Sequence, residues 1–146
     1  METGAATNLE ECARRLLDDE VASGKSPDAK VFSAFRVCEK LRGPLGKLLG
    51  LGGFRALLSR ALALEGVEFP WLRTLYINPD STVAGLEGLK LELDSSSVTE
   101  GELALTAQLL RLLVTFIGPA LTLGLIAEVW PNVVLDDLNF GNEELP

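Results

Sequence analysis

A long apolar segment from Val98 to Ile117 constrains the fold of this chain more than any other stretch. It is apolar on nearly every helical face, and Ser97 and Glu100 at its start have the spacing of a capping box. A helix of this kind is buried on most of its sides, so we expect it to lie at the centre with other helices around it. The residues that keep a polar strip along it are Gln108, Arg111 and Thr115.

Several other segments repeat apolar residues at the three- and four-residue spacing of an amphipathic helix. Leucine supplies 30 of the 146 residues and is a good helix former, whereas the β-branched and aromatic residues that favour strands are scarce. Glycine or proline ends most of these segments, as is typical of helix termini. The sequence therefore predicts an all-α fold, a compact bundle of five to six helices around a central hydrophobic helix at about 98–117. The other predicted helices cover 7–23, 27–42, 53–65 and 119–130.

The segment at 67–97 is harder to assign to helix or strand. Pro70 could begin a short helix, or residues 73–77 could form a short strand. Leucines alternate with charged residues at 89–93, which is strand periodicity, so a small β-hairpin in 73–93 is one prediction. An irregular segment is the other, because an isolated hairpin is marginal in water unless it packs on the helices.

The length of 146 residues predicts one domain. We expect a flexible N-terminal tail at 1–6, a single helical domain at 7–131 and an acidic C-terminal tail at 132–146. The first residues lack the cationic and apolar regions of a signal peptide. The longest uncharged run, 112–127, has 16 residues, fewer than the about 20 that cross a bilayer. We therefore expect no membrane span and a cytoplasmic location.

The glycine-rich stretch GPLGKLLGLGGF at 43–54 suggests a phosphate-binding loop at first sight. A phosphate loop needs a hydroxyl directly after its lysine, but Leu48 follows Lys47 here. A dinucleotide-binding loop needs a third glycine and a preceding strand, and the residues before this stretch are helical in pattern. The sequence favours a connector between two helices, in which glycines allow close approach. A functional hinge or a partner-docking loop is the alternative.

The residue types present exclude several kinds of catalysis. The chain has no histidine, so Ser-His-Asp and Cys-His arrangements cannot form. Cys12 and Cys38 occupy apolar helical positions without the paired spacing of a zinc site, so we predict two buried thiols. The acidic clusters at 18–20 and 136–137 lack the apolar surroundings that raise a carboxyl pKa. We predict no enzyme activity, catalytic residue, metal or cofactor, and we keep a carboxylate-based enzyme as a lesser alternative.

The net charge of −8 narrows the range of partners. Binding to nucleic acid normally requires a cationic surface for the phosphates, so we expect no nucleic-acid partner. An acidic surface attracts basic proteins over a distance. The expected partner is a protein, with a basic one favoured, or a second copy of this chain.

Seven apolar residues are candidates for binding that partner. Each tryptophan stands beside a proline at a predicted helix boundary, and tryptophan is enriched at binding hot spots. The C-terminal tail mixes acids with apolar residues, as short docking segments do. The alternative is that the tryptophans are buried corner residues and that the tail folds back on its own domain. The candidate residues are Leu48, Leu51, Trp71, Trp130, Leu135, Leu138 and Phe140.

The function that this sequence favours is a non-enzymatic protein–protein interaction module, such as an adaptor, a regulatory subunit or an assembly factor. It would bind its partner through apolar surface, and surface acids would steer the encounter. The alternative is a carrier of an apolar small molecule or lipid, held in a cavity between the leucine-rich helices.

Overall fold

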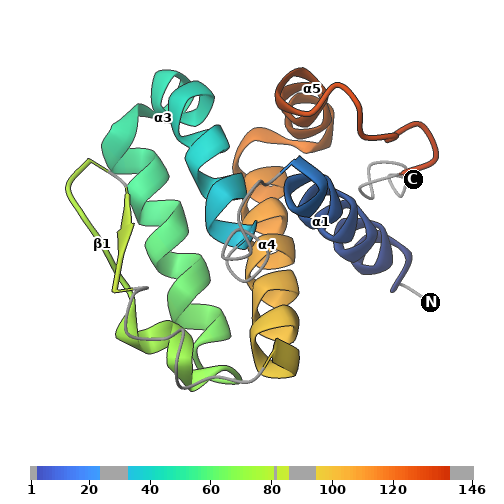
Figure 1. Cartoon of the computed structure of the whole chain (residues 1–146). Helices are drawn as coiled ribbons and strands as arrows, with labels where there is room; N and C mark the ends of the chain where they lie inside the picture. The colour runs from blue at the N-terminus through green and yellow to red at the C-terminus, as the bar shows by residue number, and fades with distance from the viewer. Residues whose placement is uncertain (1–2, 24–32, 81, 86–94, 139–146) are drawn as a thin grey trace.

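The computed structural model of this chain describes residues 3–23, 33–80, 82–85 and 95–138. These residues are mostly helical, as the sequence predicts, and two short strands accompany the helices (Figure 1). The elements in chain order are α1 (Thr3–Ser23), α3 (Ser33–Glu65), the 3-10 helix η1 (Pro70–Thr74), β1 (Tyr76–Ile77), β2 (Val83–Ala84), α4 (Ser95–Ile117) and α5 (Pro119–Val129). The described residues thus contain four α-helices. The predicted number of five to six is not confirmed, because α3 joins two of the predicted helices.

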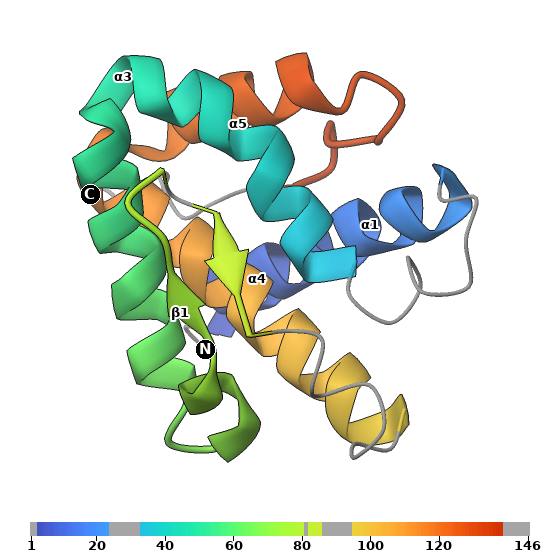
Figure 2. The same ribbon diagram turned by 60° about the vertical axis from the view of Figure 1, so that its left-hand side comes forward.

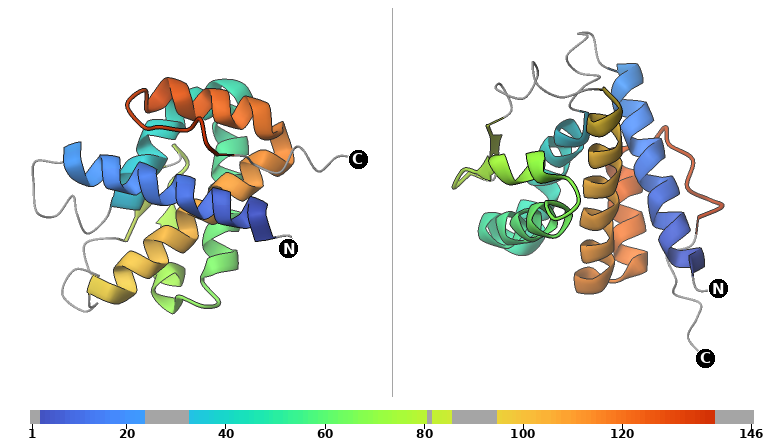
Figure 3. Two further views of the ribbon diagram at one scale, coloured as in Figure 1. Left: turned by 90° about the vertical axis from the view of Figure 1, so that its right-hand side faces the viewer. Right: turned by 90° about the horizontal axis from the view of Figure 1, so that it is seen from below.

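Helix α4 packs against α1, α3 and α5, and the right-hand view in Figure 3 shows it between α1 and α3. Most of its leucines are buried, which follows from the apolar faces visible in the sequence. The helix begins at Ser95, a little before the predicted start at Val98. The fully buried leucines that α4 contributes to the core are Leu105, Leu109, Leu110 and Leu113.

Helix α3 bends sharply at Gly50, within the predicted connector (Figures 1 and 2). Gly50 has φ 82° and ψ 155°, a positive-φ conformation that glycine adopts without steric cost. The residues on both sides of it are helical, which corrects the prediction of a loop there. Leucine is a good helix former, and Leu45 is fully buried in the core. The first arm of α3 (33–49) and its second arm (51–65) therefore meet at a single non-helical residue.

Strands β1 and β2 form a two-stranded antiparallel sheet near the second arm of α3 (Figure 2). The turn between them is held by Asp80, whose Oδ1 accepts hydrogen bonds from the Thr82 amide (3.1 Å) and the Thr82 hydroxyl (2.6 Å). An aspartate in this position closes a tight turn by bonding to the backbone two residues ahead. The register pairs Tyr76 with Ala84 and Ile77 with Val83.

The predicted hairpin in 73–93 is therefore present, but its second strand is β2. The leucines at 89–93 that suggested it lie outside the described residues. Both alternatives for the preceding segment are partly right, because Pro70 begins a short 3-10 helix and a strand starts at Tyr76.

The two ends of the described chain differ from the expected tails. Helix α1 begins at Thr3, so part of the segment predicted as a tail at 1–6 is helical. The chain from Pro131 to Leu138 leaves α5 without regular helix and packs on the domain. No helix in the described part of the chain is long and apolar enough to cross a bilayer.

Candidate functional site

The bend in α3 exposes two of the predicted partner-binding leucines. Leu48 is 46% exposed and Leu51 is 45% exposed, whereas Leu45 is fully buried. Leu49 is partly buried and packs against the core. This segment therefore contributes leucines both to the core and to the surface.

A hollow of about 470 Å³ lies on α3 beside the glycine segment, and three of its lining residues are basic. Lys40 binds the carboxylate of Glu20 (2.6 Å), and Arg42 forms an ion pair with Glu39 (3.5 Å). A phosphate loop wraps its anion with the backbone amides of a loop, whereas the residues on both sides of Gly50 here are helical. The geometry therefore supports the sequence-based argument against a phosphate loop at this position.

Trp130 is 1% exposed and lies at a junction of three helices. Its indole Nε1 donates a hydrogen bond to Glu20 Oε2 (2.8 Å), and Glu20 is itself fully buried. Lys40 Nζ also binds Glu20, and it lies 5.9 Å from the centre of the Trp130 ring. Arg36 adds an ion pair to Glu20 at 3.4 Å. We call these four side chains the Glu20 cluster, and they leave no face of Trp130 open to a partner.

Trp71 is 9% exposed and packs against helix α4. A Cβ atom at Gly101 would lie 2.6 Å from the Trp71 ring, so only glycine leaves room for it. The Trp71 Nε1 is buried and has no hydrogen-bond partner among the described residues. The side chain therefore fills the core, and we do not keep it as a partner-binding residue.

The segment after α5 folds back on the domain. Leu138 is 9% exposed and Leu135 packs on the core, while Phe140 lies outside the described residues. Arg15 on α1 donates hydrogen bonds to the Val134 carbonyl (2.6 Å) and to both carboxylate oxygens of Asp137 (2.9 and 3.0 Å). This bidentate pairing holds the segment against α1.

We predict that Asp137→Asn loosens the segment 131–138. Arg15 lowers the pKa of Asp137 by hydrogen bonding to its carboxylate, so the same loosening should occur in the parent protein when acid protonates Asp137. Limited proteolysis would measure it, and we expect cleavage in the segment to be several-fold faster in the variant. Asp136→Asn is the matched control, because Asp136 is exposed. Equal cleavage rates for the two variants would contradict the role given to Arg15.

The two thiols are unsuited to nucleophilic chemistry. Cys12 and Cys38 are buried and free, and burial raises the pKa of each to about 12. A thiol with so high a pKa stays protonated at neutral pH, and the thiolate is the reactive form. In the part of the chain that the structure describes, no group of histidine, cysteine or acidic residues could hold a metal ion.

Glu102 is a second buried carboxyl group, on α4 and 4% exposed. Its Oε2 accepts a hydrogen bond from the Ala34 amide (2.9 Å) at the start of α3. The amides of a first helical turn lack partners within their helix, so Glu102 satisfies one of them from a neighbouring helix. Desolvation raises the pKa of Glu102 to about 8. The side chain thus has a structural role that no pattern in the sequence indicates.

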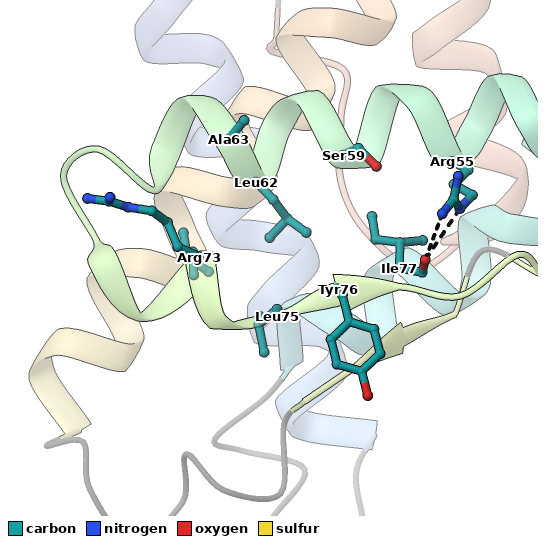
Figure 4. Close-up of a pocket in the computed structure, with 9 residues that line it drawn as sticks. Arg55, Ser59, Leu62, Ala63, Arg73, Leu75, Tyr76 and Ile77 are labelled. Carbon is teal, nitrogen blue, oxygen red and sulfur yellow. Dashed lines mark hydrogen bonds between the residues drawn. The ribbon is translucent and has the colours of Figure 1, made fainter.

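A hollow of about 490 Å³ lies between the second arm of α3 and the η1–β1 segment (Figure 4). Arg55 donates to the backbone carbonyls of Ile77 (3.1 Å) and Asn78 (3.2 Å). Arg73 donates to the Gly66 carbonyl (3.1 Å). Among the described residues, no carboxylate lines the hollow, so these residues offer no pair of acids for proton transfer. Its arginines tie β1 and η1 to α3.

The α3–α4 groove is the most apolar of the concave surfaces described here. It has a volume of about 310 Å³, and nearly all of the atoms that line it are apolar. Leu57 is 7% exposed, whereas Phe116 near the end of α4 is 61% exposed. A phenyl ring that stays in contact with water at the edge of an apolar hollow is the arrangement expected of a binding site. The groove is lined by Leu49, Gly53, Ala56, Leu57, Arg60 and Phe116.

None of the predicted partner-binding residues that the structure describes lines the groove, although two of them are close to it in the chain. Leu48 precedes Leu49 in the chain and Leu51 follows it by two residues, whereas the two tryptophans and Leu138 are buried elsewhere. The sequence did not indicate the groove, because Phe116 is one of many apolar residues in a helix that is apolar on nearly every face. Gly53 and Ala56 gave no distinct signal, because the same helix has several other small residues, among them Gly52 and Ala61.

Comparison of this chain with models of protein families, with curated proteins and with solved structures found no match.

Proposed function

We propose that this protein is a non-enzymatic interaction module that binds a protein partner in the α3–α4 groove. The observation that carries the proposal is the apolar groove with Phe116 exposed at its edge. Burial of apolar surface is the main favourable term in protein association. Aromatic side chains contribute large areas to such contacts, so Phe116 is the residue from which we expect the largest contribution.

The surroundings of the groove extend the apolar surface available to a partner. Leu64, near the end of the second arm of α3, is 42% exposed. Residues 53, 57, 60 and 64 repeat at three- and four-residue spacing, so they share one face of that arm. Leu48 and Leu51 are exposed at the bend where the arm begins. A partner that covers the groove could therefore contact leucines at both ends of the arm.

Phe116→Ala is expected to weaken partner binding by roughly 30-fold, which corresponds to about 2 kcal/mol for an interface hot spot. A photo-cross-linking residue placed at Ala56 inside the groove should trap the partner in the cells that make this protein. The cross-linked product should be largely lost when Phe116→Ala is added. The matched control is the same cross-linking residue placed at Ser59, which is on the same arm of α3 but does not line the groove.

The substitution tests binding without disturbing the fold. Phe116 is 61% exposed, so its truncation should change the free energy of unfolding by only about 0.5 kcal/mol. A cross-link from Ala56 that persists at full strength in Phe116→Ala would contradict the proposal, as would the absence of any cross-link. Native mass spectrometry that shows a co-purifying apolar molecule lost in Phe116→Ala would instead favour the carrier function.

A further inference from the structure

We propose that the α3–α4 groove takes an acidic amphipathic helix of the partner, with Arg60 paired to one of its carboxylates. This inference rests on the proposed function, because it names the chemistry of the occupant of the same groove. It departs from the expectation that the net charge of −8 gives for the whole chain.

The charges of the protein are distributed unevenly between α3 and the rest of the chain. Helix α3 has six basic and two acidic residues, a net charge of +4, in a chain of net charge −8. Arg36 and Lys40 on the first arm are paired with Glu20 of α1, so the attraction that an acidic partner segment meets at the groove comes mainly from Arg55 and Arg60 on the second arm. The charged residues of α3 are Arg36, Lys40, Arg42, Lys47, Arg55 and Arg60, with Glu39 and Glu65.

Arg60 is the charged residue that lines the groove. It is exposed, and no ion pair or hydrogen bond engages its guanidinium within the described residues. Arg36 and Lys40, by contrast, bind Glu20, and Arg55 binds backbone carbonyls. An arginine guanidinium can hold a carboxylate through two parallel hydrogen bonds. Arg60 is therefore free to bind a carboxylate at the edge of an apolar contact.

The shape of the groove fits a helix. Gly53 and Ala56 have little side-chain bulk, so a partner helix can approach the second arm of α3 closely, because the distance between packed helices, about 8 to 10 Å, depends on the side chains at the contact. The walls belong to the helices α3 and α4. They offer no strand edge to an extended peptide, so an amphipathic helix with apolar anchors at i, i+3, i+4 and i+7 is the mode that suits this surface.

Selection from a displayed library of helical peptides, with the full chain as bait, tests the inference. We expect enriched peptides to combine apolar residues at helical spacing with aspartate or glutamate beside them. A synthetic copy of such a peptide should bind about tenfold more weakly to Arg60→Glu. Arg60→Lys keeps the charge but not the two parallel hydrogen bonds, so it should weaken binding by less than Arg60→Glu does. Lys47→Glu makes the same charge change on α3 outside the groove, and it should leave the affinity nearly unchanged.

The location of binding is read separately, from amide chemical shifts of Gly53 and Ala56 on addition of the peptide. Shifts at these residues with peptides that are not acidic, or that bind Arg60→Glu as well as the parent, would overturn the acidic-helix inference and leave the proposed function standing. If Arg60→Glu and Lys47→Glu weakened peptide binding equally, the inference would also be overturned, because the net charge of α3 alone would then explain the loss of affinity. If no enriched peptide changed the amide chemical shifts of Gly53 and Ala56, the result would count against both the acidic-helix inference and the proposed function.

Discussion

Glu20→Ala should lower the free energy of unfolding by about 3 kcal/mol, since it removes the acceptor of a buried polar cluster. The Trp130 Nε1 would lose its hydrogen bond in a fully buried place, and Lys40 and Arg36 would lose their carboxylate partner. The two cations are each 41% exposed, so water can solvate them in part, which keeps the loss below that of a wholly buried pair. Urea denaturation followed by tryptophan fluorescence measures the change.

Two other variants separate the contributions within the Glu20 cluster. Glu20→Gln keeps an oxygen that can accept from Trp130, so its loss should be smaller than that of Glu20→Ala. Asp18→Ala removes an exposed acid from the same helix and should change stability by only about 0.5 kcal/mol. If Glu20→Ala matched Asp18→Ala, the cluster would have no role in stability.

The stability of the parent protein should fall as the pH rises from about 5 to 9, and Glu102→Gln should remove most of this fall. In the unfolded chain Glu102 titrates near its ordinary pKa of 4.5, and in the folded protein at about 8. Between these values the folded state holds one more proton, so raising the pH favours unfolding. The stabilisation is complete below about pH 4.5 and is lost above about pH 8. The total loss is on the order of 3 to 5 kcal/mol.

The composition of the chain makes this titration easy to observe. There is no histidine, which is the side chain that otherwise dominates titration in this range. Unfolding curves at a series of pH values should show the slope in the parent and in Glu100→Gln, whose carboxyl is exposed on the same helix. If the free energy of unfolding of the parent protein were the same at pH 9 as at pH 5, the prediction would be wrong, because ionisation of Glu102 would then not destabilise the folded state.

The sequence predicted what depends on local apolar pattern. The central helix, the other helical segments and the break at Gly118–Pro119 followed from spacing and from helix termini, because burial and backbone geometry act on neighbouring residues there. The bend at Gly50 was placed in the right segment, but the sequence predicted a loop where the chain is helical on both sides. Local glycine content could not show that the leucines between the glycines would keep the helix continuous.

The interaction surface was harder to predict, because it depends on which faces of two helices remain uncovered. Phe116 and Leu113 look equivalent in an all-apolar helix, yet Leu113 is fully buried and Phe116 is 61% exposed. Trp130 looked like an anchor for a partner, and only the pairing with Glu20, 110 residues away in the chain, shows that it belongs to the interior. The basic character of the segment that forms α3, by contrast, can be counted in the sequence, although the net charge of the whole chain conceals it.

That long-range pairing also has a consequence for how the chain acquires its structure during synthesis. Glu20 leaves the ribosome long before Trp130, and chains emerge at about 5 to 20 residues per second. For several seconds Glu20 can therefore pair with Arg36 and Lys40 of α3, while Trp130, its hydrogen-bond donor, has not yet been synthesised. Contacts between residues so distant in the sequence slow folding. The junction of α1 with α5 should accordingly be one of the last parts of this protein to become protected from hydrogen exchange.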